Sequence, residues 1–567
     1  MKKNKFTSTL LGCLLGGLIF NSCTNLEETT YNKIVSSNFY QTKDDVYRSF
    51  LRTFEHGYWT VQGTQFFLQE NPADQLMTPN RQGDWYDGGT YFRLHYHTWT
   101  PTDGYCSDAW NNLFVGVSLA NNSLEDIRAL DVSKFNMTIA EQKMLVAELR
   151  TMRAWYYLRL FDLYRNIPIV ETTKGASQSP LQATPQETFN FIEKELKEAV
   201  TDLGKKGDAN IVTSRWTQAG AMALLSRLYL NSKVYTGADK FTDCAAICQD
   251  IIDGKYGSYG IASRWDAPYD WNNDLCEETI FAFPGSFGRT HWQYDGGMYW
   301  WSLPYNVNKY FEFTDFGNAN PKYTLQPGHD VAGNLYNFTS NLGQPFVKFQ
   351  KYADDVRLTV YKNLGNNTRE GMFLYGYLIC SDGSKVQTTK GYDLYIRDQV
   401  GIFNNLAPGQ IPSDLTSTMN TADQNSGVYF VKYPFYKTTD THKIESDFSV
   451  IRLAEVYYSL AECKFRSGDK AGAEKLLNTV RRRYYPTGSS SLYPEDGSKL
   501  TESELLDEWG REFLGEGRRR TDLIRFGKFN TGIWWDKSAD ADNHTEIFPI
   551  GQTVLGVSSQ LKQNPGY

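Results

Sequence analysis

The stretch from Ser449 to Arg483 restricts the fold of this chain more than any other part of its sequence. Apolar residues recur there at intervals of three and four: Val450, Leu453, Tyr457 and Leu460, then Ala473, Leu476, Leu477 and Val480. This spacing predicts two helices, each with one apolar face, joined by a turn at Gly468 after which Asp469 caps the second helix. Because such a hairpin cannot bury its apolar faces alone, the chain should supply further helix pairs to pack against it.

Other parts of the chain carry the signals of such helix pairs. Thr138 with Glu141 and Thr184 with Glu187 form capping boxes, and the first opens a long helix that ends before Pro168. Helical periodicity is found over residues 42–55, 109–165, 185–200, 214–230, 241–253, 449–483 and 501–526. The sequence therefore predicts a mainly α fold on a tetratricopeptide-like helical-repeat frame, although insertions hide any regular repeat length.

Long, irregular and aromatic-rich stretches interrupt this frame. Residues 58–106 and 255–445 lack helical periodicity, and their Gly, Asn and short alternating segments predict loops and short strands. We therefore predict a helical region at 41–254 with a binding loop at 58–106, an inserted lobe at 255–445 and a second helical region at 446–567. Nine of the fourteen Trp lie in two clusters: Trp59, Trp85, Trp99 and Trp110, then Trp265, Trp271, Trp292, Trp300 and Trp301. A core would spread them more evenly, so the clustering favours a ligand-binding role for some of them.

Charge and cysteine content exclude some classes of function. A net charge of −7 argues against a nucleic-acid-binding surface, because such proteins usually carry a basic face. The basic runs Arg481–Arg483 and Arg518–Arg520 are therefore interpreted as helix-end charges and structural ion pairs. Six cysteines form no zinc motif and are predicted to be buried thiols, with a disulfide as the alternative: Cys106, Cys244, Cys248, Cys276, Cys380 and Cys463.

The N-terminal residues have the pattern of a bacterial lipoprotein signal. Basic residues precede the apolar run Leu10–Phe20, which is too short to span a bilayer as a helix and is followed by Cys23. This predicts a signal peptide at 1–22, lipid attachment to Cys23 and a tether at 23–40. Acyl chains contribute ~0.8 kcal/mol per buried methylene, so several of them make a stable anchor. The alternative is an ordinary secretory signal in which the cysteine is incidental.

Four helical blocks and the C-terminal tail occur in the order found in one protein family. The blocks contain Arg150-x-x-Arg153-Ala154 with Ile167-Pro168, Arg215-Trp216 with Leu225-x-Arg227-x-Tyr229-Leu230, Arg452-Leu453-Ala454-Glu455, and Arg511-Glu512-Phe513 with Asp522-Leu523-Ile524-Arg525. The tail contains Phe548-Pro549-Ile550 and Gln563-Asn564-Pro565-Gly566-Tyr567. Together with Cys23, this ordered set resembles the SusD/RagB family of outer-membrane nutrient-uptake lipoproteins.

The resemblance implies a fold, a location and a function. It implies a mostly helical protein on a tetratricopeptide-like frame, anchored by lipid in the outer membrane and facing the cell exterior. It also implies that the protein captures glycans and delivers them to a SusC-like TonB-dependent transporter. We expect no enzymatic activity, and no cofactor, metal or nucleic-acid partner.

Two segments combine aromatic rings with polar side chains. A flat ring suits the apolar face of a sugar, while Asp, Asn and Arg suit its hydroxyl edge. We predict that residues 80–89 and 291–301 converge on one face and bind glycan. The predicted ligand-binding residues are Arg81, Asp84, Trp85, Tyr86, Trp292, Tyr294, Tyr299 and Trp300. Alternatively, the Gly-Asp and Asp-Gly steps are turn signals and the rings fill a small local core.

Other hypotheses compete with glycan binding. His95 and His97 would lie on one face of a strand and, with Asp84 and Asp87, hold a metal, but a clear third ligand is missing. A helical-fold glycoside hydrolase or lyase would need two carboxylates at a defined separation, for which Asp84 and Asp87 are the candidates. A peptide-binding helical-repeat adaptor would not need the aromatic insertions. We therefore expect glycan binding without catalysis.

Overall fold

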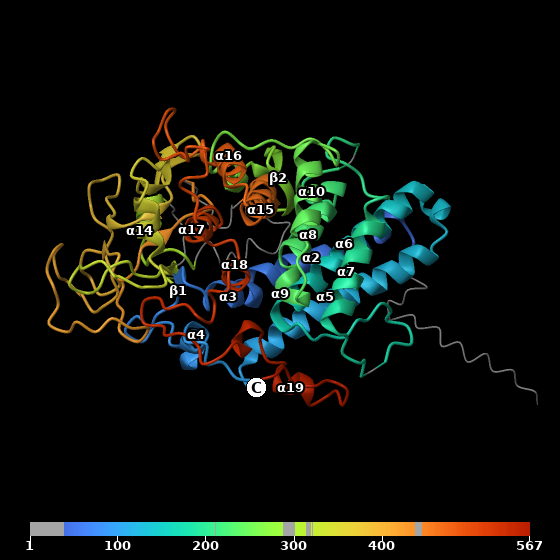
Figure 1. Ribbon diagram of the computed structural model, residues 1–567, viewed down its shortest axis with the longest axis horizontal. Coiled ribbons are helices and arrows are strands. Elements are labelled where there is room, and N and C mark those ends of the chain that lie inside the picture. Colours follow the sequence, from blue (N-terminus) through green and yellow to red (C-terminus); the bar gives the residue numbers. More distant parts are fainter. Residues whose placement is uncertain are drawn as a thin grey trace, which may run out of the picture.

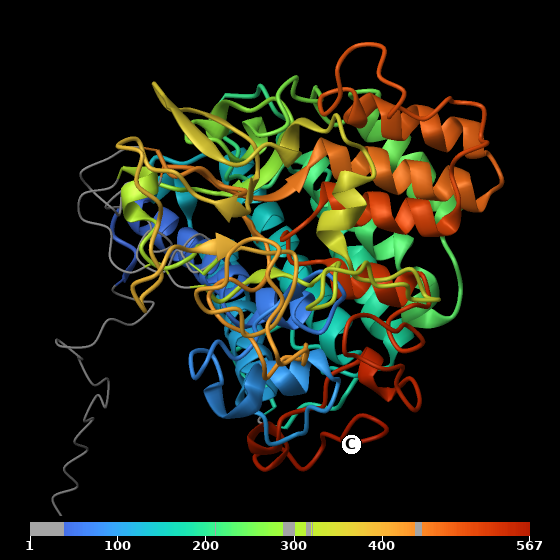
Figure 2. The same ribbon diagram turned by 90° about the vertical axis from the view of Figure 1, so that its left-hand side faces the viewer.

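The helices gather on one side of the molecule, and a loop-rich region lies on the other side (Figure 1). The computed structural model describes residues 39–567 apart from residues 178, 210, 287–300, 313–318, 320 and 437–444. The loop-rich side faces the viewer in Figure 2, where short strands lie among long connections. Within these described ranges, no helix has both the length and the apolar character needed to cross a bilayer. The predicted mainly α fold with irregular insertions is confirmed.

The N-terminal half supplies most of the helices. They are α2 (Lys43–Gln62), α3 (Thr64–Glu70), α4 (Thr90–His95), α5 (Gly104–Ala129), α6 (Ile139–Tyr164), α7 (Pro185–Ala199), α8 (Gln218–Leu230), α9 (Ser232–Thr236) and α10 (Phe241–Ile252). The capping boxes of Thr138 with Glu141 and Thr184 with Glu187 are present as predicted, and each cap typically contributes ~1 kcal/mol. Helix α5 packs against α6, α6 against α7, and α8 against α10, so consecutive helices form pairs.

The C-terminal half contains the predicted helical hairpin. Its elements are β10 (Phe448–Arg452), α15 (Leu453–Arg466), α16 (Lys470–Arg481), α17 (Glu502–Glu512), α18 (Arg519–Arg525) and α19 (Gln552–Leu555). The Asp469 side chain accepts a hydrogen bond from the Gly472 N–H at 2.9 Å and caps α16 as predicted. Helix α15 packs against α16 and also against α10, so the hairpin joins the N-terminal helices.

Two predicted helix boundaries are wrong, one in each half of the chain. Helix α2 continues to Gln62, because the buried Phe54, Tyr58 and Val61 extend its apolar face. Val450 is not helical: it lies in β10, which pairs antiparallel with β2 (Thr279–Phe283), and α15 begins only at Leu453. A short apolar run beside a helix fits either period, so sequence alone does not separate the strand from the helix.

The single helix predicted over 501–526 is also wrong. The structure has two helices there, α17 and α18, separated by residues 513–518. Gly515 and Gly517 have φ angles of 68° and 70°, which a right-handed helix does not accommodate. The chain therefore turns sharply between the two helices and brings α18 back beside α17.

Short strands and helices stabilise the loop-rich region. The strands form two-stranded antiparallel pairs: β1 (Leu76–Met77) with β3 (Thr324–Leu325), β4 (Lys362–Gly365) with β5 (Thr368–Glu370), β6 (Phe373–Leu374) with β9 (Tyr429–Phe430), and β7 (Gly376–Tyr377) with β8 (Tyr395–Ile396). Two short helices, α13 (Asn308–Phe311) and α14 (Pro345–Gln350), lie in the same region. Residues 80–89 closely follow β1, so the pairing of β1 with β3 places them beside the inserted region.

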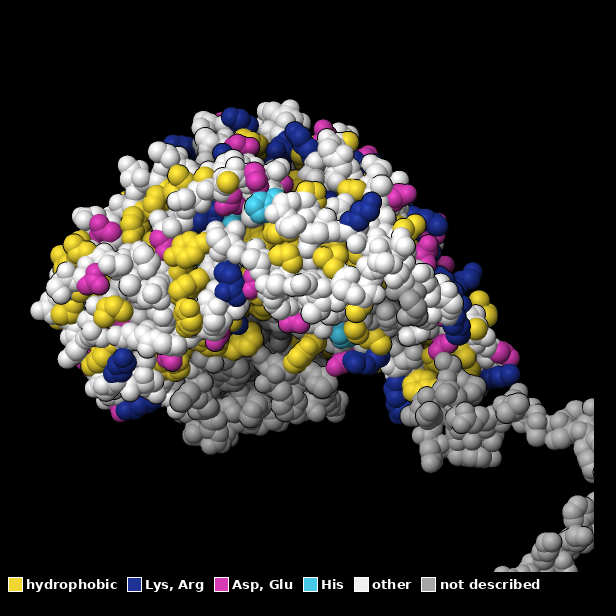
Figure 3. Space-filling model, turned by 90° about the horizontal axis from the view of Figure 1, so that it is seen from below, with side chains coloured by type: hydrophobic (Ala, Val, Ile, Leu, Met, Phe, Trp, Pro, Cys, Tyr) yellow, Lys and Arg dark blue, Asp and Glu magenta, His cyan; other side chains and the backbone are white. Residues whose placement is uncertain are grey.

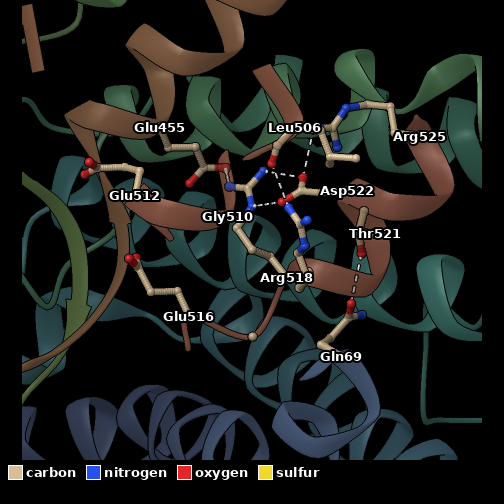
Figure 4. A network of polar contacts seen from close by, with 12 residues as sticks. Gln69, Glu455, Leu506, Gly510, Glu512, Glu516, Arg518, Thr521, Asp522 and Arg525 are labelled. Atoms are coloured by element: carbon tan, nitrogen blue, oxygen red, sulfur yellow. Dashed lines mark hydrogen bonds and ion pairs between the residues drawn. The ribbon is translucent and has the colours of Figure 1, made fainter. Parts of the chain in front are cut away.

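Buried arginines and carboxylates form ion pairs within the C-terminal half and between the two halves. Arg452, which is 1% exposed, contacts Glu512 at 2.5 Å and Glu516 at 2.8 Å. Figure 4 shows the neighbouring part of this network, where Arg518 contacts Asp522. The prediction that the basic runs form structural ion pairs is confirmed by the pairs Arg481–Glu508, Arg482–Glu495, Arg483–Glu278, Arg518–Asp522, Arg519–Asp74 and Arg520–Asp162.

The apolar core holds cysteines and some of the clustered tryptophans. All six cysteines are buried and carry free thiols, as predicted: Cys106, Cys244, Cys248, Cys276, Cys380 and Cys463. Trp99 and Trp110 are buried in the same core, and the indole N–H of Trp99 donates to the Tyr567 hydroxyl at 2.6 Å. Clustering of tryptophans in the sequence therefore does not separate ligand rings from core rings.

Candidate functional site

Residues 80–89, hereafter the site loop, turn several times within a few residues. Positive φ angles occur at Gln82, Gly83, Trp85, Asp87, Gly88 and Gly89. For Trp85 the angle is 67°, a conformation that costs a residue with a side chain ~1–2 kcal/mol. Such strain persists only where surrounding contacts enforce it, and it concentrates at functional sites. Both the backbone geometry and the composition of the loop therefore favour a functional site there.

Arg81 fastens the site loop to two distant segments. Its buried guanidinium donates to the carbonyl oxygens of Pro321 at 3.1 Å and of Asp423 and Ser426 at 2.7 Å each. It also donates to the Thr324 hydroxyl at 2.8 Å. Since all three guanidinium nitrogens donate to protein atoms, Arg81 positions the loop and does not present its charge to solvent.

Asp84, Trp85 and Tyr86 lie at the outer end of the loop. Asp84 is exposed and accepts a hydrogen bond from the Tyr305 hydroxyl at 3.0 Å. The Trp85 ring is half-buried against Tyr91, while Tyr86 is 49% exposed. The loop thus presents one carboxylate and two rings together, and it touches the segment that follows residues 291–300.

A buried lysine lies beneath these rings. The Lys322 ammonium is 4.0 Å from the centre of the Trp301 ring, 5.0 Å from Tyr91 and 5.4 Å from Trp85. Burial lowers the pKa of Lys322 to about 7, although the Asp87 carboxylate opposes this shift. Cation–π contacts are worth ~2 kcal/mol or more when desolvated, so Lys322 connects rings from the site loop with a ring from the inserted lobe.

Only part of the predicted site lies within the described residues. Trp292, Tyr294, Tyr299 and Trp300 lie outside the described residues, as does Cys23 with the predicted signal peptide. Trp301 is the described end of the second predicted segment, and Tyr305 follows it closely. Through Lys322 and Asp84 they contact the site loop, so the described end of that segment lies beside it.

The two histidines do not form the predicted strand face. His95 ends helix α4, where its Nε2 contacts Asp536 at 2.6 Å. His97 lies after that helix and contacts Asp540 at 2.7 Å through Nδ1. Among the residues that the structure describes, no group of three His, Cys, Asp or Glu is arranged to hold a metal ion. The histidines instead join α4 to residues 536–540.

Sequence reasoning missed Lys322, Tyr305 and Tyr91. Lys322 follows a proline and precedes a tyrosine, a context that carries no binding signal by itself. Its aromatic neighbours in the site loop and α4 lie more than two hundred residues earlier in the chain. Only the folded arrangement, set by the pairing of β1 with β3, brings them together.

The surface on the side of α4 shows no large patch of one charge sign. Figure 3 views the molecule from below, and acidic and basic side chains are interspersed over the described part of that face. Hydrophobic side chains occur there in small groups. A surface of this kind lacks the basic stripe that nucleic-acid binding requires.

Two family models match separate parts of the chain. A model described as SusD family matches residues 409–567, and a model described as starch-binding associating with outer membrane matches residues 55–230. Together they match more than half of the 567 residues. The starch-binding protein SusD of Bacteroides thetaiotaomicron is 25% identical over 535 residues, which are 89% of this chain and 85% of that protein.

Solved structures share the fold over nearly the whole chain. A laminarin-binding SusD-like protein has a TM-score of 0.65 at 20% identity, covering 93% of this chain and 100% of that chain. Surface glycan-binding protein A from Bacteroides fluxus has a TM-score of 0.59 at 17% identity, again covering 93% of this chain and 100% of that chain. The two family models, the alignment over 89% of the chain and the fold agree with the ordered sequence blocks, and the chain therefore belongs to the SusD/RagB family.

Proposed function

We propose that this protein is a non-catalytic glycan-binding lipoprotein. It is anchored in the outer membrane through Cys23, faces the cell exterior, and passes captured oligosaccharide or polysaccharide to a SusC-like TonB-dependent transporter. The site loop, with Trp301 and Tyr305, forms the binding surface. Trp292, Tyr294, Tyr299 and Trp300 are proposed to extend it.

One observation carries this proposal. Trp85 is partly exposed and has a strained backbone conformation beside the exposed Tyr86, and Asp84 lies next to both. The rings offer flat apolar faces for the C–H face of a sugar, and the carboxylate accepts hydrogen bonds from its hydroxyl groups. Arg81 and Lys322 act from below by fixing the loop and its rings.

Relatives support the ligand class and the location. The aligned relative is named as a starch-binding protein, and one structural neighbour as a laminarin-binding protein. The N-terminal family model is described as associating with the outer membrane. Transporter partnership and lipid attachment are proposed from the family and from the sequence pattern that ends at Cys23.

Trp85→Ala tests the proposal directly. The purified protein is run on native gels cast with individual polysaccharides, and affinity for each retarding glycan is then measured by calorimetry. Loss of the central ring should weaken the affinity about tenfold or more, which corresponds to ~1.4 kcal/mol. Analysis of the glycan after incubation should show no shortened products.

Trp271→Ala is the matched control, because Trp271 is 42% exposed and lies outside the site loop. It should retain full affinity and the same melting temperature as the unsubstituted protein. Equal retardation of Trp85→Ala and Trp271→Ala would refute the assignment of the site. Release of oligosaccharide by the unsubstituted protein would refute the non-catalytic function.

A further inference from the structure

A pocket of about 100 Å³ lies where the N-terminal helices meet the C-terminal hairpin. Helix α6 contributes Trp155 and Arg159 to its wall, α8 contributes Arg227, and the β10–α15 junction contributes Ser449 and Glu455. Figure 4 shows Glu455, Glu516 and Arg518 of this wall near one another. No residue of the site loop lines the pocket, so it is separate from the proposed glycan site.

The charged groups on the pocket wall are paired, with one exception. Arg227 pairs with Glu455, Glu516 with Arg452, and Arg518 with Asp522. Asp162, which also lines the pocket, pairs with Arg520 at 2.9 Å. Arg159 forms no hydrogen bond or ion pair within the described part of the chain, and its guanidinium lies 4.3 Å from the centre of the Trp155 ring.

Three hydrogen-bond donors on the wall also lack partners. The Arg159 Nε–H, the Trp155 indole N–H and the Ser449 hydroxyl are buried without an acceptor in the described structure. The Trp155 and Ser449 side chains belong to residues that are 1% and 6% exposed. Leaving a buried donor unpaired costs ~1–3 kcal/mol, so three around one pocket indicate that something occupies it.

The electrostatic environment indicates the charge of the occupant. Burial and the neighbouring Arg227 lower the pKa of Arg159 to about 9, although Asp162 and Glu455 oppose this shift. Arg159 is the cation of the described pocket wall that has no carboxylate at ion-pair distance. Water molecules would satisfy the donors, but they would not balance the charge of this guanidinium.

We propose that this pocket binds a small monoanionic carboxylate, held by the Arg159 guanidinium, the Ser449 hydroxyl and the Trp155 indole N–H. A carboxylate brings two oxygens with several lone pairs and a single negative charge, and it forms strong charge-assisted bonds with guanidinium groups. A buried water needs ~10–15 Å³ by the same measure of volume, so the pocket has room for a ligand of several atoms. Bound there, the anion links α6 of the N-terminal half to β10 of the C-terminal half.

The test measures binding of sodium acetate, sodium glucuronate and sodium phosphate by calorimetry and by the shift in melting temperature. Ionic strength is held constant with sodium chloride, so that a general salt effect cancels. Acetate should bind saturably and raise the melting temperature. If glucuronate binds more tightly than acetate, the natural ligand is the carboxylate of an acidic sugar. If the two bind equally, the natural ligand is a free small carboxylate.

Two variants and one control assign the site. Arg159→Met should weaken acetate binding at least tenfold, and Ser449→Ala, which removes one donor with little effect on packing, by severalfold. Arg128→Met removes the same charge from an exposed position on α5 and should leave acetate binding unchanged, as should Trp85→Ala. The absence of saturable acetate binding, binding of phosphate alone, or equal acetate affinity in Arg159→Met and the unsubstituted protein would overturn the proposal.

Discussion

The buried cations of the helical frame and those beneath the site loop are stabilised in opposite ways. In the frame, Arg452, Arg481 and Arg511 contact carboxylates that are themselves buried. Beneath the site loop, Arg81 donates to carbonyl and hydroxyl oxygens, and Lys322 lies among aromatic rings. Both of these cations are buried, and neither pairs with a carboxylate of the described residues.

The two kinds of partner have different consequences for the nearby carboxylates. A pair of arginine and glutamate fixes the geometry of the helices that it joins, and it holds the carboxylate in the interior. The cations beneath the site loop use neutral partners instead, and Asp84 and Asp87 are exposed at the surface. The frame therefore uses its acidic groups for structure, whereas the site loop keeps them available for a ligand.

The largest effect is expected from Arg452→Met in the frame. The substitution leaves the buried Glu278 and Glu512 and the partly buried Glu516 with less compensating charge, which should destabilise the protein by ~3–5 kcal/mol. Urea denaturation measures the change. Arg48→Met removes a surface pair in which the arginine side chain is 69% exposed, and it should cost ~0–1 kcal/mol. Similar losses in the two variants would contradict the importance of the buried network.

The stability of Arg452→Met should also depend on pH differently from that of the unsubstituted protein. Burial opposes ionisation of Glu516, but Arg452 and Lys432 outweigh it and hold the pKa at about 2. Since this folded-state pKa lies below the ordinary value of 4.5, the stabilisation is complete above about pH 4.5 and is lost as the pH falls toward 2. Stability of Arg452→Met should therefore fall less steeply over this range.

An intermediate effect is expected from Arg81→Met. The change removes hydrogen bonds to four oxygens, three of them carbonyls in distant segments, and should cost ~2–3 kcal/mol of stability. Glycan affinity should fall with it, because the loop loses its anchor. Arg81→Lys keeps the charge but not the planar fork, so it should resemble Arg81→Met. Reduced affinity with unchanged stability would instead place Arg81 at the ligand.

The smallest change in stability is expected from Lys322→Met, and this substitution should stabilise the protein. Below pH 7 the buried ammonium is a net cost that its cation–π contacts only partly offset, so the substitution should stabilise the protein by ~1–2 kcal/mol. The folded-state pKa of about 7 lies below 10.5, so the unfolded chain binds more protons between these values. Stability of the unsubstituted protein should therefore rise with pH over that range, and the advantage of Lys322→Met should shrink.

Denaturation at several pH values from 6 to 10 tests this prediction. Lys351→Met serves as a control for loss of a lysine, since the Lys351 side chain is 56% exposed and pairs with Glu504. That variant should show no stabilisation at low pH. Destabilisation by Lys322→Met at pH 6 would show that the ammonium stabilises the fold. That result would contradict the proposed difference between the cations of the helical frame and those beneath the site loop.

Local signals in the sequence predicted the frame well. Thr138 and Glu141 lie three residues apart, so their capping box depends on nothing beyond the helix that it opens. Asp469 caps α16 for the same reason. Some of the predicted helix boundaries were wrong. Val450 fits a strand as well as a helix, and the left-handed φ angle of Gly515 is not indicated by the residues around it.

The site was only partly predictable. The strained turns of the site loop were indicated by its Gly and Asp residues, and these flank Trp85. The hydrogen bonds of Arg81 were not indicated, because arginine in an aromatic-rich loop equally suggests a ligand contact. Lys322 was missed because its environment is built from segments far apart in the sequence.

The contacts of Arg81 also determine when the site loop is completed during folding. Its nearest partner in sequence, Pro321, lies 240 residues further along the chain, and its most distant partner, Ser426, lies 345 residues further. Contacts of such separation carry a large loop-closure cost, so they form after local helices. A chain synthesised from its N-terminus therefore carries an unfinished site loop until just over three quarters of it has been made.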